Sequence, residues 1–180
     1  MTPRIGESRT HLDLAIGTIV QEAGTKGGIK LGLPNVSTSW ICFCEMKWES
    51  DISPGVTNDP NRNQLVRVIE SALYFQSNGD FADEVHVALV TPTVFRDRPF
   101  VFKNYKGKFK RYESDIANIL EDLRNCTLKP RGHFNAVERI EVLQLHWPTF
   151  DELFASIPDS AISDALKTFY QNYGAYLKEG

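Results

Sequence analysis

Hydrophobic and polar positions alternate along several short stretches of the chain, and a period of two residues is typical of β-strands. Residues 11–20 and 40–48 are the first two such stretches, and the glycine- and proline-rich residues between them predict turns. We therefore expect these two strands to form an antiparallel pair. Residues 84–95 are the run richest in β-branched residues, and residues 139–147 predict another strand.

Helical periodicity occurs between these predicted strands. Asp59 is a predicted N-cap and Pro60 suits the first helical position, after which apolar residues recur at helical spacing up to about Phe75. Residues 114–125 predict an amphipathic helix that is capped by Ser114.

Two more helices are predicted near the C-terminus. Thr149 and Glu152 have the spacing of a capping box, which predicts a helix that begins just after Thr149. Asp159 is the predicted cap of the last helix, whose apolar stripe consists of Ile162, Leu166, Phe169 and Tyr173. Strands and helices mixed in this order predict a mixed α/β domain built on one central sheet.

Composition sets the scale of this domain. A chain of 180 residues, of which 42% are hydrophobic, suits one domain with a substantial core. We expect residues 1–180 to form a single domain, with a core at about 11–93 and a C-terminal elaboration at about 94–180.

Charge and cysteine content limit the partners, the disulfides and the location that we expect for the protein. The net charge of −3 gives no general attraction to a polyanion, so any contact with nucleic acid must come from local patches. Cys42 and Cys44 lie one residue apart, which is poor geometry for a disulfide, and the third cysteine, Cys126, has no obvious partner. The polar start and the lack of a long apolar run predict a cytoplasmic protein without a membrane partner.

Two charged residues interrupt the apolar stretch WICFCEMKW at 40–48. Alternation places Glu45 and Lys47 on one face of the strand with Ile41 and Phe43, and we expect this face to be largely buried. Burying an ionised side chain costs on the order of several kcal/mol unless a partner or a metal compensates. The pair therefore indicates a functional site, and a structural ion pair of little energetic weight is the alternative.

Two further polar residues extend this candidate site. Asp13, on the first predicted strand, lies on the same side of the sheet as Glu45 in one possible register, and Glu22 is the alternative carboxylate. Gln64 falls in the first turns of the following helix. His11 shares the face of Asp13, and we expect it to be structural or exposed to solvent.

The order of these residues resembles the PD-(D/E)xK nuclease superfamily, which has the restriction-endonuclease-like fold. The matching residues are Asp13, Glu45, Lys47 and Gln64, and the resemblance covers roughly residues 11–93. It implies a central mixed sheet flanked by helices and metal-dependent hydrolysis of nucleic acid, with DNA as the expected substrate. The superfamily core usually opens with a helix, but only twelve residues precede Asp13, so we expect the chain to be part of a longer protein.

The residue types suit the cleavage of a phosphodiester. Two carboxylates can hold Mg²⁺ or Mn²⁺, and we expect Asp13 and Glu45 to be these ligands. The resemblance implies the backbone carbonyl of Met46 as a third ligand. Lys47 is predicted to orient or polarise the attacking water, and Gln64, near a helix N-terminus, to contact the substrate strand.

A basic and aromatic segment, FKNYKGKFKRY at 102–112, contains no acidic residue. Cations that meet phosphates and rings that stack on bases predict a nucleic-acid surface, and a solvated hairpin with its rings packed inward is the alternative. The predicted binding residues are Lys103, Lys106, Lys108, Lys110 and Arg111.

Three functions therefore stay open. The first is a nuclease that uses Mg²⁺ or Mn²⁺, either as a homodimer or attached to further domains. The second is a catalytically inactive domain of the same fold that binds nucleic acid or protein. The third is an unrelated α/β interaction domain in which Glu45 and Lys47 form a structural pair.

Overall fold

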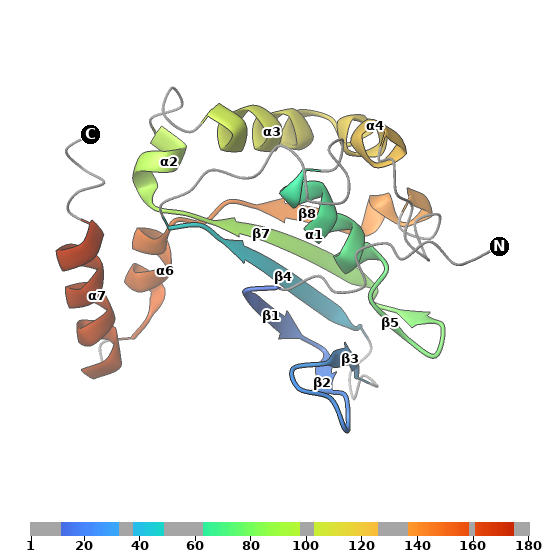
Figure 1. Ribbon diagram of the computed structural model, residues 1–180, viewed down its shortest axis with the longest axis horizontal. Coiled ribbons are helices and arrows are strands. Elements are labelled where there is room, and N and C mark those ends of the chain that lie inside the picture. Colours follow the sequence, from blue (N-terminus) through green and yellow to red (C-terminus); the bar gives the residue numbers. More distant parts are fainter. Residues whose placement is uncertain are drawn as a thin grey trace.

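The structure, a computed structural model, describes residues 12–32, 38–48, 63–97, 103–125, 137–158 and 161–174. These residues form a mixed α/β fold in which helices flank a four-stranded mixed sheet, as the sequence predicted (Figure 1). None of the helices in this described part of the chain is both long enough and apolar enough to cross a bilayer.

The central sheet has the strand order β1-β4-β7-β8. The edge strand β1 pairs antiparallel with β4, as the sequence predicted, whereas β4 with β7 and β7 with β8 are parallel. Parallel neighbours need a crossover connection, which helices provide here. The strands are Leu14–Gly17 (β1), Trp40–Met46 (β4), Glu84–Val90 (β7) and Leu143–His146 (β8).

The remaining elements are helices and short hairpins. The helices are Gln64–Leu73 (α1), Thr93–Asp97 (α2), Lys103–Ser114 (α3), Ala117–Asn125 (α4), Phe150–Ser156 (α6) and Ala161–Gly174 (α7), with a 3-10 turn at Ile140–Val142. Two small hairpins pair Ile19–Gln21 (β2) with Ile29–Leu31 (β3), and Gln76–Ser77 (β5) with Asp80–Phe81 (β6).

Helix α1 crosses one face of the sheet and supplies much of the core. Its residues Leu65, Val68, Ile69 and Ala72 are fully buried, which confirms the predicted apolar stripe. The predicted start of this helix is wrong, because Asn63 has an extended backbone and its side chain accepts a hydrogen bond from the Val66 amide. The helix therefore begins at Gln64. The predicted cap Asp59 and its neighbour Pro60 lie outside the described residues.

The other predicted boundaries shift by a few residues. The first predicted strand divides at Gly17, which has a φ of +122° and lies so close to the Trp40 carbonyl that a Cβ atom would collide with it. The predicted strand at 84–95 ends at Val90, because Pro92 lacks a donor and a short helix follows it. The predicted strand at 139–147 begins only at Leu143.

Helix caps were predicted with mixed success. The capping box of Thr149 and Glu152 is present, with both reciprocal hydrogen bonds made. The predicted cap Ser114 instead belongs to the preceding helix α3, and the Asp115 carboxylate accepts from the Ala117 amide at 2.8 Å. A carboxylate suits this position because its negative charge also interacts favourably with the positive, N-terminal end of the helix dipole.

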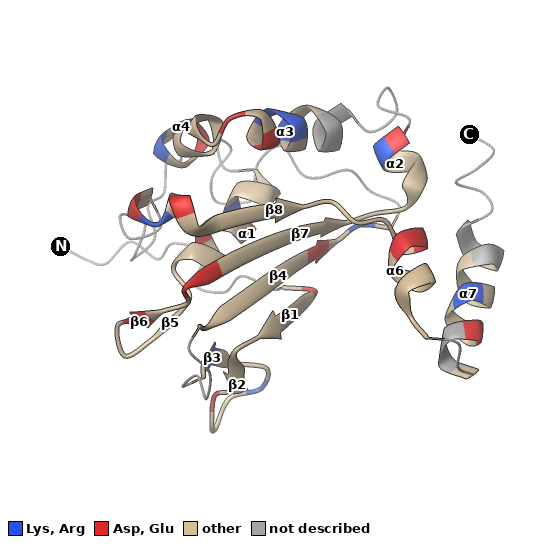
Figure 2. Cartoon of the chain, turned by 180° about the vertical axis from the view of Figure 1, so that it is seen from behind, with Lys and Arg blue, Asp and Glu red and all other residues tan. Residues whose placement is uncertain are grey.

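The two faces of the sheet have different surroundings. On the side of α1, the core encloses Ile41 and Phe43 at 0% and 2% exposure. Figure 2 shows the opposite face of the sheet, with the four strands in front of α1. In this view no described helix lies over the strands. On that side Leu14, Ile16 and Trp40 are 42–47% exposed.

Candidate functional site

The register of the sheet brings Asp13 next to Glu45. Leu14 lies opposite Cys44, so one further step along the antiparallel pair places Asp13 opposite Glu45. Residues that face each other in this way share one side of the sheet. The Asp13 Oδ2 also accepts a hydrogen bond of 2.7 Å from the backbone amide of Met46. The sequence left this register open, and the structure has the arrangement that the candidate site requires.

Glu45 and Lys47 form an ion pair at the end of β4. The Lys47 Nζ lies 2.9 Å from the Glu45 Oε1, and the side chains are 15% and 4% exposed. The backbone amide of Lys47 donates to the Val90 carbonyl at 2.9 Å, which extends the pairing of β4 with β7. The predicted burial of this face is confirmed.

Gln64 contacts the same carboxylate from the first turn of α1. Its Nε2 donates a hydrogen bond to the Glu45 Oε1, so strand and helix meet at this oxygen. The sequence placed Gln64 against a substrate strand, and that contact stays a prediction. What the structure adds is a second donor to Glu45, contributed by an element that lies far from β4 in the sequence.

The surroundings of Glu45 raise its pKa. Burial is the largest cause, and the negative charge of Asp13 acts in the same direction. Lys47 opposes the shift through its hydrogen bond and its charge, and Arg67 opposes it through charge. Sequence reasoning missed Arg67, although its position three residues after Gln64 on one helix face was a usable signal.

The donor set at this site suits a hard divalent cation. Carboxylate and carbonyl oxygens are the ligands that Mg²⁺ and Mn²⁺ prefer, and Mg²⁺ is commonly held by only one or two carboxylates. Two carboxylates, Asp13 and Glu45, lie on this side of the sheet beside the Met46 backbone. Within the described ranges, no group of three or more His, Cys, Asp or Glu side chains could hold a metal ion. A closed zinc site uses four ligands, mostly Cys and His, whereas Asp13 and Glu45 offer the carboxylate oxygens that suit Mg²⁺. The alternative carboxylate, Glu22, lies in the β2–β3 hairpin.

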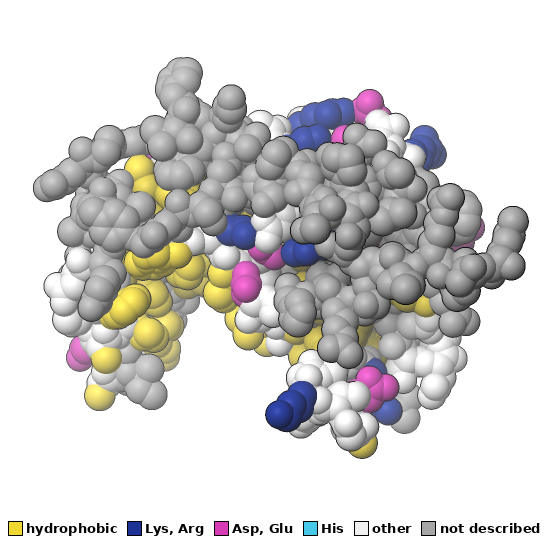
Figure 3. All heavy atoms as spheres, in the orientation of Figure 1, with side chains coloured by type: hydrophobic (Ala, Val, Ile, Leu, Met, Phe, Trp, Pro, Cys, Tyr) yellow, Lys and Arg dark blue, Asp and Glu magenta, His cyan; other side chains and the backbone are white. Residues whose placement is uncertain are grey.

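Charged side chains gather at the surface in this region. In the space-filling view, acidic and basic side chains lie close together where β1 begins and β4 ends, and hydrophobic side chains lie to their left and below them (Figure 3).

The basic segment at 102–112 is largely a helix, so the predicted hairpin is wrong, whereas the inward packing of rings that this alternative expected is confirmed for Phe109 and Tyr112. Phe109 and Tyr112 pack inward on α3, and each is 2% exposed. Three of the predicted binding residues have carboxylate partners: Lys108 with Asp122, Lys110 with Glu113, and Arg111 with Glu121. The side chains of Lys103 and Lys106 lie outside the described part of the structure. A nucleic-acid surface on α3 stays a prediction.

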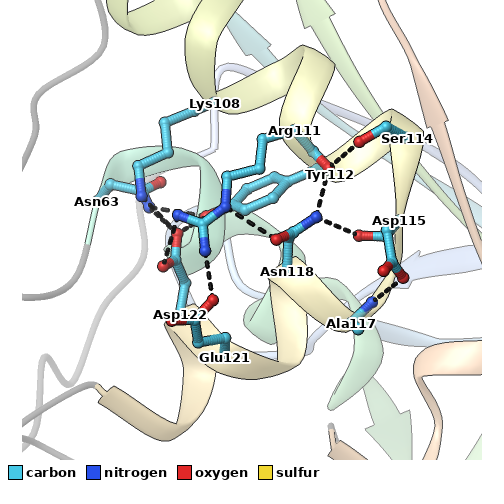
Figure 4. A network of polar contacts seen from close by, with 10 residues as sticks. All are labelled: Asn63, Lys108, Arg111, Tyr112, Ser114, Asp115, Ala117, Asn118, Glu121 and Asp122. Carbon is cyan, nitrogen blue, oxygen red and sulfur yellow. Dashed lines mark hydrogen bonds and ion pairs between the residues drawn. The ribbon is translucent and has the colours of Figure 1, made fainter.

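A second buried carboxylate, Asp122, lies on α4 at the centre of a polar network (Figure 4). Its Oδ2 accepts from the Tyr112 hydroxyl at 2.5 Å, from the Lys108 Nζ at 2.6 Å and from the Asn63 Nδ2 at 3.4 Å. Burial and the Asp122 carboxylate together raise the pKa of Tyr112. Sequence reasoning missed this network, because the partners of Asp122 lie 10 to 59 residues from it in the sequence.

Comparison of the chain with models of known protein families, with curated proteins and with solved structures finds no match.

Proposed function

We propose that the protein is a metal-dependent nuclease that hydrolyses phosphodiester bonds of nucleic acid, with DNA as its expected substrate. The observation that supports this proposal is the meeting of four residues from three elements at one end of β4. Asp13, Glu45, Lys47 and Gln64 are spread over fifty-two positions of sequence, yet Glu45 contacts both Lys47 and Gln64, and Asp13 bonds the adjacent amide.

Each residue has a role that follows from its chemistry. Asp13 and Glu45 would hold Mg²⁺ or Mn²⁺, which when bound supplies an activated water and neutralises developing negative charge. Lys47, beside Glu45, orients the attacking water and offsets charge on the phosphate. Gln64 holds the Glu45 oxygen from the side of α1, so that the carboxylate keeps one orientation.

A binding module of the same fold is the second candidate function. The observation that favours it is the sheet face opposite α1, where Leu14, Ile16 and Trp40 are partly exposed. Apolar side chains grouped on one face are typical of surfaces that bind a partner. This candidate differs from the first in one respect that is easily measured, because it requires no cleavage.

The first experiment is cleavage of linear duplex and single-stranded DNA in the presence of Mg²⁺, Mn²⁺ or EDTA. Wild-type protein is compared with Glu45→Ala and Lys47→Ala, and Lys30→Ala on β3 is the matched lysine control. Cleavage that needs metal, persists in the control and disappears in both site variants is the expected result. Cleavage that survives in Glu45→Ala and Lys47→Ala would overturn the proposal. A wild-type protein that binds DNA without cutting it would favour the binding module.

A further inference from the structure

Asn63 connects the network around Asp122 to the start of α1, the helix that carries Gln64. Its side-chain oxygen accepts from the Val66 amide at 2.9 Å and so caps helix α1. Its side-chain nitrogen donates to the Tyr112 hydroxyl at 2.8 Å and, at 3.4 Å, to Asp122. A planar amide that is bonded at both ends has one orientation, and its neighbour Gln64 is the residue that contacts Glu45.

Burial makes these contacts specific. Asn63 and Tyr112 are each 2% exposed and Asp122 is 9% exposed, so water competes little for their polar groups. Lys108 supplies the positive charge that a buried carboxylate needs. The Tyr112 hydroxyl donates to Asp122 and accepts from Asn63, so α3, α4 and the start of α1 share a single set of bonds.

We propose that Tyr112 and Asp122 are positioning residues of the candidate site: they hold the Asn63 amide, and so keep the Gln64 side chain on Glu45. Both residues bond the Asn63 side chain, which lies at the first turn of α1, and Figure 4 shows the three residues together. The inference deepens the proposed function, and its catalytic consequence rests on that function.

Two variants separate this role from helix capping. Tyr112→Phe keeps the buried ring and removes only the hydroxyl. Asn63→Ser keeps a good N-cap and removes the amide that reaches Tyr112, since serine and asparagine are comparable caps. The matched control is Ser39→Ala, which removes a 3% exposed hydroxyl and its 2.8 Å bond to Asp83 at the opposite end of β4.

The primary measurement is the NMR signal of the Gln64 side-chain amide in the full chain, which requires neither metal nor activity. We expect Tyr112→Phe and Asn63→Ser to move this signal toward that of a free, solvated amide, and Ser39→Ala to leave it unchanged. Wild-type signals in both network variants would overturn the inference. An equal change in the control would also overturn it, because general loosening of the fold would then be the cause.

A double-mutant cycle tests the catalytic consequence. We expect Tyr112→Phe to lower the maximal rate of DNA cleavage with Mn²⁺ about fivefold at unchanged KM, and to have no such effect in a Gln64→Ala background. Equal effects in the two backgrounds would contradict action through Gln64. If the wild-type protein does not cut DNA at all, the proposed function fails, and the Gln64 signal still decides the positioning role.

Discussion

Glu45 and Asp122 are both buried carboxylates, but their surroundings differ in charge. Asp122 is surrounded by donors: Tyr112, Lys108 and Asn63 reach one of its oxygens. Glu45 also has donors, yet a second carboxylate, Asp13, lies across the strand pair and acts on its pKa in the same direction as burial.

This difference indicates what each group does. The protein itself supplies the hydrogen-bond donors of Asp122, and through them this carboxylate joins α4 to α3 and to the start of α1. The charged form of a carboxylate is destabilised both by burial and by a second carboxylate nearby. A bound cation would offset the free-energy cost of both. The comparison therefore supports a structural role for Asp122 and is consistent with the catalytic role that we propose for Glu45.

Exchange of each carboxylate for its amide is the strongest test of this comparison. Glu45→Gln should lower metal-dependent cleavage on the order of a thousandfold, because a neutral amide is a poor ligand for Mg²⁺. Asp122→Asn should lower it by no more than about tenfold, because it acts only through the position of α1. Rates at saturating DNA and Mn²⁺ measure both effects. Equal losses would remove the distinction between the two carboxylates.

The structural role of Asp122 should be visible in the stability of the protein. Asp122→Ala leaves the buried Tyr112 hydroxyl and the Lys108 ammonium without their shared partner, and we expect a loss of about 2 kcal/mol in the free energy of unfolding. The control is Glu113→Ala, which removes an exposed pair with Lys110 and should change stability by less than about 0.5 kcal/mol. Urea unfolding measures both. A loss in Asp122→Ala as small as that of the control would contradict a structural role.

Asp13→Asn should separate metal binding from stability. The amide oxygen can still accept from the Met46 amide, and removal of one negative charge relieves the repulsion with Glu45. We expect Mn²⁺ to bind about tenfold more weakly while the free energy of unfolding changes by less than about 0.5 kcal/mol. Calorimetric titration and thermal unfolding test the two parts. Unchanged Mn²⁺ affinity would exclude Asp13 as a ligand.

The smallest effect concerns an exposed carboxylate. Arg96 and the Thr149 amide lower the pKa of Glu152 to about 2. A carboxyl group whose pKa is lowered by folding stabilises the protein above its usual pKa, and this contribution is lost as the pH falls toward about 2. Because the pair is largely exposed, we expect less than about 1 kcal/mol. Glu152→Gln should flatten the acid side of the stability curve by that amount, and an unchanged curve would contradict it.

Glu45 should act in the opposite sense when no metal is bound. Folding raises its pKa, so the folded protein binds a proton more tightly than the unfolded chain and stability falls as the pH rises through the folded pKa. The two glutamates therefore affect stability in opposite directions as the pH changes. Arg96 and the Thr149 amide stabilise the charged form of Glu152, whereas burial destabilises the charged form of Glu45.

Short-range patterns predicted well where only neighbouring residues matter. A period of two residues placed Glu45 and Lys47 on the face of Ile41 and Phe43, and the structure has them there. The capping box at Thr149 was also predicted, because its hydrogen bonds join residues three apart. The basic segment shows the limit, since alternating lysines and rings do not reveal whether the backbone forms a strand or a helix.

Contacts between residues that are distant in the sequence could be identified only from the tertiary structure. Local pattern determined the strand, the helix and the identity of the charged pair, because side-chain direction follows from backbone period alone. Only the tertiary structure decided that Asp13 faces Glu45, that α1 begins at Gln64 and that Asn63 joins Tyr112 to the site. These depend on register and on the packing of buried polar groups, which are set by the competition among all long-range contacts rather than by any one segment.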